Sequence, residues 1–114
     1  MTETEFLDLA DSTLNAIEAA LDRLNDADHL DVECSRSGNV LEIEFLHNSS
    51  KVIVNSQAAM QELWVAARSG GFHYRYLDGQ WINTRDGGSE LFDALSQIAT
   101  EQSGGAPVVV SANP

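Results

Sequence analysis

The residues of this 114-residue chain that could do chemistry are concentrated at its start. The segment from Glu3 to Glu33 holds ten carboxylates and one base, Arg23. Carboxylates are hard oxygen donors that suit Fe(II), Fe(III), Mn(II), Ca(II) and Mg(II). Glu18 and Asp22 are one helical turn apart, close enough to share a cation. Because no histidine or cysteine joins the acids at ligand spacing, the pattern predicts weak, exposed sites at which water completes the coordination shell.

A helix would place five of these acids in one row. At 100° per residue, the row spans an arc of about 80°, and an apolar arc is centred about 140° away. Like charges at i,i+4 repel by roughly 0.2–0.5 kcal/mol per pair, so the row works against the helix that carries it. The pattern leaves two interpretations open, a solvated face that aids solubility and a functional surface. The acids are Asp8, Asp11, Glu18, Asp22 and Asp26, and the apolar residues are Phe6, Ala10, Ile17, Leu21 and Leu24.

Composition narrows the class of partner. The chain carries 18 acids and 6 Lys or Arg, a formal net charge of −12, so phosphate backbones and anionic membranes would be repelled. Cations and basic protein surfaces remain as possible binding partners. The single cysteine, Cys34, allows no internal disulfide, and its alternation with Leu30 and Val32 favours a buried apolar thiol. Without a signal-peptide pattern or an apolar run of about 20 residues, we expect a cytoplasmic protein.

The remaining sequence predicts an α+β fold. Thr2 and Glu5 form a capping box at the start of the first helix, which the periodicity extends to Leu24 or Asp26. Period-2 alternation then predicts six short strands, with turns that include Gly70-Gly71 and Asp78-Gly79. A second helix follows Ser89 and ends at Gly104-Gly105. The predicted strands are 30–34, 41–46, 51–55, 60–67, 72–77 and 80–84.

Tight turns imply an antiparallel sheet, and two helices with one apolar face each would cover one side of it. The expected architecture is therefore a two-layer α/β sandwich, with the other sheet face exposed to solvent. We expect a single domain over residues 1–105 and a tail over 106–114. The tail could be loose or could dock between the helices, and docking is favoured.

Several spaced motifs occur along the chain. They are Asn55 and Gln57, Trp64, the run Gly70-Gly71-Phe72-His73, Gly79 with Trp81-Ile82, and Gly88 with Leu91-Phe92. Together with the helix–sheet–helix order, these motifs resemble the frataxin family, in particular its bacterial members, and the resemblance covers Phe6 to about Gly104. The chain departs from the family at Ala59, where many members have Pro, and at Leu7, where some bacterial members have His that could serve as a nitrogen ligand.

The resemblance implies a role in iron–sulfur cluster assembly, with weakly bound iron and with the cysteine desulfurase and the cluster scaffold protein as partners. We call the seven acids that match the family's metal-binding residues the acidic ridge. Within it, Glu18, Asp22 and Asp26 are expected to contact the desulfurase. The acidic ridge consists of Asp11, Glu18, Asp22, Asp26, Asp28, Asp31 and Glu33.

A second candidate surface lies around Trp64. If Leu63 and Val65 face the helices, alternation turns Trp64 towards solvent, where an exposed tryptophan can anchor a partner. Asn55 and Gln57 would complete this patch, which we assign to the scaffold protein. The competing interpretation is a tryptophan covered by its cross-strand neighbours.

We expect a binding protein, not an enzyme, and a monomer, with iron-dependent oligomers left open. The alternative function is a ferroxidase or iron-storage protein, which would need paired Glu and Glu-x-x-His motifs that this sequence lacks. An acidic nucleic-acid mimic or a plain structural domain is the third interpretation.

Overall fold

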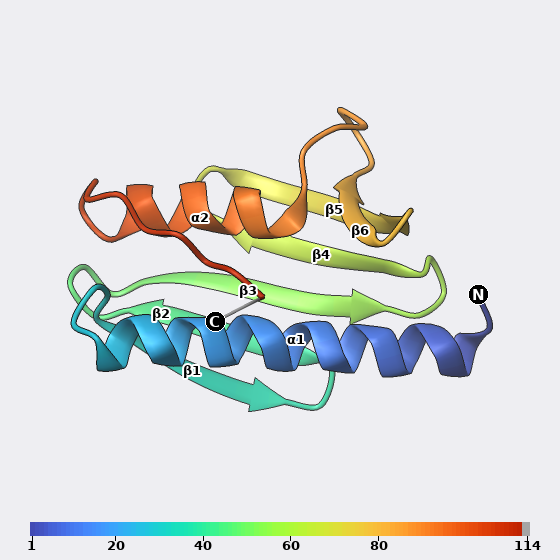
Figure 1. The fold of residues 1–114 in the computed structure, drawn as a ribbon, viewed down its shortest axis with the longest axis horizontal. Coiled ribbons are helices and arrows are strands. Elements are labelled where there is room, and N and C mark those ends of the chain that lie inside the picture. Colours follow the sequence, from blue (N-terminus) through green and yellow to red (C-terminus); the bar gives the residue numbers. More distant parts are fainter. Residues whose placement is uncertain (113–114) are drawn as a thin grey trace.

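The computed structural model describes residues 1–112, and in it both helices cover the same face of one sheet (Figure 1). The sheet has six strands in sequence order, each antiparallel to the next. The predicted two-layer α+β sandwich is thus confirmed. The elements are α1 (Glu3–Asp26), β1 (Val32–Ser37), β2 (Val40–Phe45), β3 (Ser50–Gln57), β4 (Glu62–Ala67), β5 (Gly70–Leu77), β6 (Gln80–Asn83) and α2 (Leu91–Gln102).

The predicted capping box begins α1. The Thr2 hydroxyl accepts from the Glu5 backbone N–H at 3.1 Å, and the Glu5 carboxylate accepts from the Thr2 N–H at 2.9 Å. Two of the N–H groups that a helix start leaves unpaired are therefore satisfied. The predicted apolar arc faces the sheet, with Phe6, Ala10 and Ile17 fully buried. Neither helix is long and apolar enough to cross a membrane within the described residues.

Two predicted turns lie elsewhere than expected. The Gly70-Gly71 turn is wrong, because both glycines belong to β5 and the chain reverses at Arg68-Ser69. Gly70 has a φ of +138°, a conformation that glycine accepts without a Cβ clash, so it serves the start of the strand. The first hairpin turn is also shorter than predicted. It consists of Gly38 and Asn39 alone, since β1 continues to Ser37.

A buried tryptophan joins the first helix to the last strand. Trp81 on β6 donates from Nε1 to the Thr13 hydroxyl at 3.1 Å, and Thr13 in turn donates to the Leu9 carbonyl at 2.8 Å. The Phe6 ring meets Trp81 edge-on, with 6.1 Å between centroids. Because its indole N–H is satisfied, Trp81 can be buried without an unpaired donor.

The tail docks between the helices, as favoured by the sequence (Figure 1). Val108 and Val110 are buried in the core, while Val109 between them is 73% exposed. Two hydroxyls on α2 accept the tail's backbone N–H groups, Thr100 from Val108 at 3.0 Å and Ser96 from Val110 at 2.8 Å. Residues 113–114 of the predicted tail lie outside the described residues.

Candidate functional site

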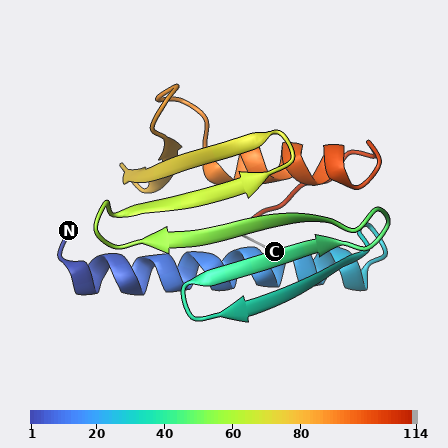
Figure 2. The same cartoon turned by 180° about the vertical axis from the view of Figure 1, so that it is seen from behind.

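The acidic ridge follows α1, the loop after it and the first residues of β1. Glu18 is half-buried and the other six acids are exposed. The Asn25 side chain accepts from the Val32 backbone N–H at 3.1 Å, which ties the start of β1 to the last turn of α1. β1 is the edge strand of the sheet, beside α1 (Figure 2). The acids of α1 are therefore followed by Asp28 and Asp31 in the loop and by Glu33 at the start of β1.

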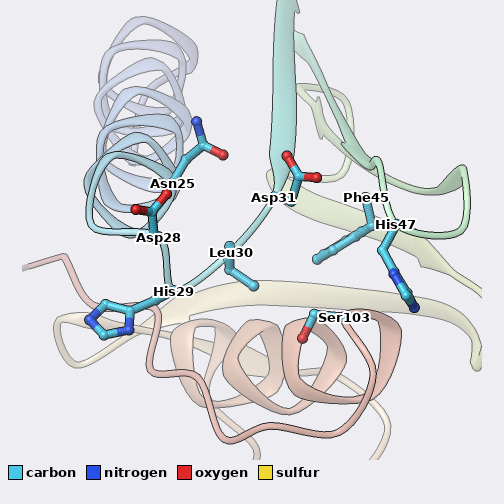
Figure 3. Close-up of a pocket in the computed structure, with 8 residues that line it drawn as sticks. All are labelled: Asn25, Asp28, His29, Leu30, Asp31, Phe45, His47 and Ser103. Atoms are coloured by element: carbon cyan, nitrogen blue, oxygen red, sulfur yellow. The ribbon is translucent and has the colours of Figure 1, made fainter.

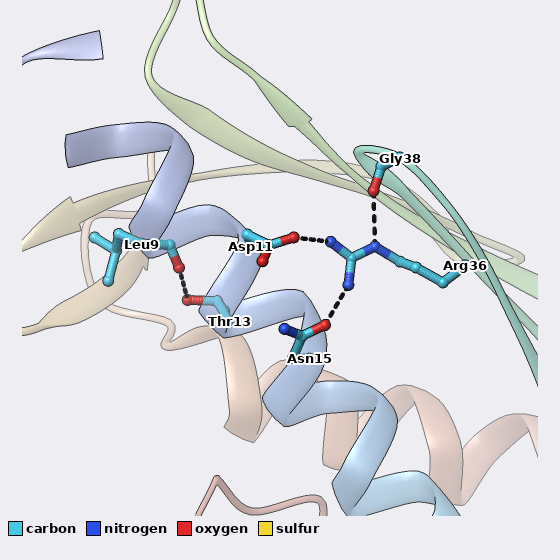
Figure 4. Close-up of polar contacts among 6 residues, drawn as sticks. All are labelled: Leu9, Asp11, Thr13, Asn15, Arg36 and Gly38. Atoms are coloured by element: carbon cyan, nitrogen blue, oxygen red, sulfur yellow. Dashed lines mark hydrogen bonds and ion pairs between the residues drawn. The ribbon is translucent and has the colours of Figure 1, made fainter. Parts of the chain in front are cut away.

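Asp11 differs from the rest of the ridge because it is ion-paired. Arg36 on β1 donates to the Asp11 carboxylate at 2.5 Å and to the Asn15 side chain at 2.6 Å (Figure 4). The same guanidinium donates to the Gly38 carbonyl at 2.8 Å, so it fastens the first hairpin to α1. A cation at Asp11 would have to compete with this arginine. The pairing depends on helix–strand packing, and no local pattern in the sequence reveals it.

The other six ridge acids form no ion pair within residues 1–112. In the same part of the chain, no three Asp, Glu, His or Cys side chains gather closely enough to hold a metal ion. The arrangement is an open row, in which neighbouring carboxylates such as Glu18 and Asp22 can share a hydrated cation. The exposure of most of these acids agrees with the sequence, whereas cation binding by the row and its strength remain predictions.

Cys34 on β1 lies close enough to the acidic ridge for the ridge carboxylates to affect the pKa of its thiol. Its side chain packs against the core as predicted from the alternation with Leu30 and Val32, but it is half-buried and not fully buried. Burial is the main cause that raises the pKa of the thiol to about 12, and the carboxylates of Asp22 and Glu18 raise it further. Because metals bind the thiolate, a thiol held protonated is a poor ligand at neutral pH.

The far end of the ridge borders a hollow of about 590 Å³ between the loop after α1, the turn after β2 and the C-terminal end of α2. Two histidines line it, but His29 and His47 lie on opposite sides and do not converge (Figure 3). Asp28 and Asp31 contribute the ridge carboxylates at its wall. The hollow therefore extends the open acidic surface and does not enclose a coordination site.

The second candidate surface is on the sheet face that is turned away from the helices (Figure 2). Leu63 and Val65 are buried against the helices, so Trp64 points outwards as predicted, and it is half-exposed. Asn55 is its partner on β3, and Gln57 lies two residues further along that strand. The structure thus brings the three predicted contact residues onto one face.

Both interpretations of Trp64 hold in part, because His73 covers one side of its ring. The two rings stack with 4.3 Å between centroids and an angle of 9° between planes. The patch predicted from the sequence includes neither this contact nor Glu62 and Arg75 beside it. Alternation places Trp64 and His73 on the outer face of β4 and β5. It does not show that they are opposite each other, because that register depends on the turn at Arg68-Ser69.

Comparison with known proteins assigns this chain to a family. The model of the frataxin-like domain matches residues 1–105. This chain belongs to the frataxin family. It is 66% identical over 110 residues to the iron–sulfur cluster assembly protein CyaY of Janthinobacterium sp. (strain Marseille), and 62% identical to that of Herminiimonas arsenicoxydans. Each match covers 96% of this chain and 96% of the relative.

Solved frataxin structures share the architecture. Frataxin from Psychromonas ingrahamii superposes with a TM-score of 0.79 at 30% identity, and the match covers 100% of both chains. Trimeric yeast frataxin complexed with ferrous iron has a TM-score of 0.71 at 23% identity, covering 90% of this chain and 87% of the yeast chain. The family's two helices and six-stranded antiparallel sheet are therefore those of this member too.

Proposed function

We propose that this frataxin-family protein acts in bacterial cytoplasmic iron–sulfur cluster assembly, as an adaptor that binds iron weakly and contacts the cysteine desulfurase through the acidic ridge. The observation that carries the proposal is the row of six exposed or half-buried acids on α1, the following loop and β1, which form no ion pair within residues 1–112. Relatives at 66% and 62% identity are named iron–sulfur cluster assembly proteins, which supports the pathway.

The ridge and the Trp64 face are separated and differ in charge, which supports two partners at once. The ridge flanks β1 at one edge of the sheet, while Trp64 is three strands away on β4. The Trp64 face carries Arg75 and His73, whose side chains are 51% and 47% exposed. A basic desulfurase surface would be steered to the ridge. The scaffold protein would use the Trp64 face together with Asn55 and Gln57.

Metal titration tests the ridge as an iron site. Fe(II), or Mn(II) as a paramagnetic substitute, should broaden NMR signals of Glu18, Asp22 and Asp31 at the lowest metal levels, because these exposed or half-buried carboxylates have no cationic partner within residues 1–112. Asp11 should respond later, since Arg36 competes for its carboxylate. The controls are Glu42 and Asp93, which lie outside the ridge. Equal broadening at the controls would rule out the ridge as the metal site.

Fe(II) oxidation separates the adaptor from the ferroxidase alternative. An open row of carboxylates does not preorganise two irons, so we expect the rate of Fe(II) oxidation in air to be the same with and without the protein. The measurement is Fe(III) absorbance over time at several iron-to-protein ratios. A saturable acceleration that disappears when Glu18 and Asp22 are changed to Gln and Asn would favour the ferroxidase.

A further inference from the structure

One carboxylate on the open face of the sheet is buried. Glu62 is 3% exposed, although its side chain lies on the same side of β4 as the half-exposed Trp64 and the exposed Ala66. A buried carboxylate is unfavourable unless hydrogen bonds and opposite charge compensate for the lost water. The residues that cover Glu62 therefore have to be its partners.

Both oxygens of Glu62 are used. Oε1 accepts from the indole Nε1–H of Trp64 at 2.9 Å, and Oε2 accepts from the Arg75 guanidinium at 2.8 Å. His73 Nδ1 is 3.4 Å from Oε1. The antiparallel register explains the grouping, because Glu62 is opposite Arg75 and Trp64 is opposite His73. Two neighbouring pairs on one face thus form a single cluster of four side chains.

The cluster fixes the tryptophan at two points. The imidazole of His73 supports the flat side of the indole, and Glu62 holds its N–H. Arg75 and His73 are about half-exposed, so Glu62 is the one member of the four that is buried. The indole can therefore turn away from the sheet only if its N–H leaves the carboxylate.

We propose that Glu62 is a positioning residue, which holds Trp64 flat over His73 so that a partner meets a preformed aromatic surface. This inference rests on the proposed function, in which Trp64 contacts the cluster scaffold protein. Binding normally requires flexible side chains to be ordered, and a side chain that is already ordered avoids this loss. Removal of the Glu62 acceptor should weaken scaffold binding about three- to tenfold.

The test compares two substitutions of similar size. Glu62→Met keeps the length of the side chain and removes both acceptors, whereas Glu62→Gln keeps one oxygen for the indole N–H. Both variants should fold, because the donors that lose an acceptor, Trp64 and Arg75, are about half-exposed and can bond to water instead. The first readout is the indole N–H signal of Trp64 in a ¹H–¹⁵N spectrum. Trp81 provides an internal reference, since its N–H is bound to Thr13 in the core.

The expected result has three parts. Glu62→Met shifts the Trp64 indole signal, speeds its exchange with water and weakens scaffold binding about three- to tenfold. Glu62→Gln restores the signal and most of the affinity. Glu42→Gln, which makes the same charge change on the same sheet face, alters neither readout. A mere contribution of Glu62 to stability would lower the melting temperature and leave the affinity of the folded protein unchanged.

Other outcomes overturn the proposal. If the Trp64 indole signal is unshifted in Glu62→Met, the carboxylate does not hold the indole ring. If the signal shifts but scaffold affinity is unchanged, the hydrogen bond between Trp64 and Glu62 does not contribute to binding. A different variant tests whether Trp64 contacts the scaffold at all. If it does not, Trp64→Ala will bind the scaffold as tightly as the unaltered protein. In that case the indole signal alone still decides whether Glu62 fixes Trp64.

Discussion

Replacing Glu18, Asp22 and Asp26 together with lysine is expected to abolish binding to the cysteine desulfurase. The three acids follow one another at four-residue steps on α1 and form no ion pair in the described part of the chain, so their charge is available to a basic partner. Reversal turns attraction into repulsion, and like charges across an interface are disfavoured by several kcal/mol. We expect affinity to fall by at least roughly 100-fold, measured by titration calorimetry at low salt.

The folded state should survive this triple change. The native acids already repel one another, and Asp22 and Asp26 oppose the helix macrodipole, which lysine near the C-terminus complements. The melting temperature should therefore be unchanged or slightly raised. The matched control reverses Glu42, Asp93 and Glu101, which lie outside the ridge, and should retain binding. If the ridge variant still binds at both low and high salt, the desulfurase uses another surface.

Much of the fold can be read from local signals. The capping box, the helical period of α1 and the Asp78-Gly79 hairpin each depend on residues close together in the chain, and each is confirmed. The turn between β4 and β5 was misplaced because Gly-Gly is a typical turn signal, while the actual turn, Arg68-Ser69, is not. A glycine also suits the extended left-handed backbone of Gly70, so its presence alone does not distinguish a turn from a strand start.

The candidate site also has features that local sequence predicts and features that depend on how the elements pack. The row of acids on α1 follows from helical geometry, and the outward direction of Trp64 follows from strand alternation. The Asp11–Arg36 pair and the Glu62 cluster require the register between elements, and a shift in a turn changes every cross-strand neighbour. Burial of Glu62 is the least predictable feature, because it results from its neighbours and not from its position in β4.

Ending the chain at Gly105 is expected to lower stability by about 2–4 kcal/mol. Each of the two buried tail valines contributes roughly 1.5–3 kcal/mol, and the ordering entropy of the tail offsets part of this. Truncation would also expose core residues that Val110 covers, including Ile17 and Leu21. For a domain of this size the melting temperature should fall by about 10–20 °C. Calorimetry and urea unfolding measure the loss.

The alternating exposure of the tail supplies the control for the truncation. Changing Val108 and Val110 to Ala should reproduce a large part of the loss, because both side chains pack into the core. Val109→Ala should be nearly neutral, since that side chain is 73% exposed. Metal titration of the ridge should be unaffected, because the truncation removes none of its acids. A truncated chain with the full melting temperature would show that the docked tail contributes nothing to stability, despite the hydrogen bonds that its backbone donates to the Ser96 and Thr100 hydroxyls.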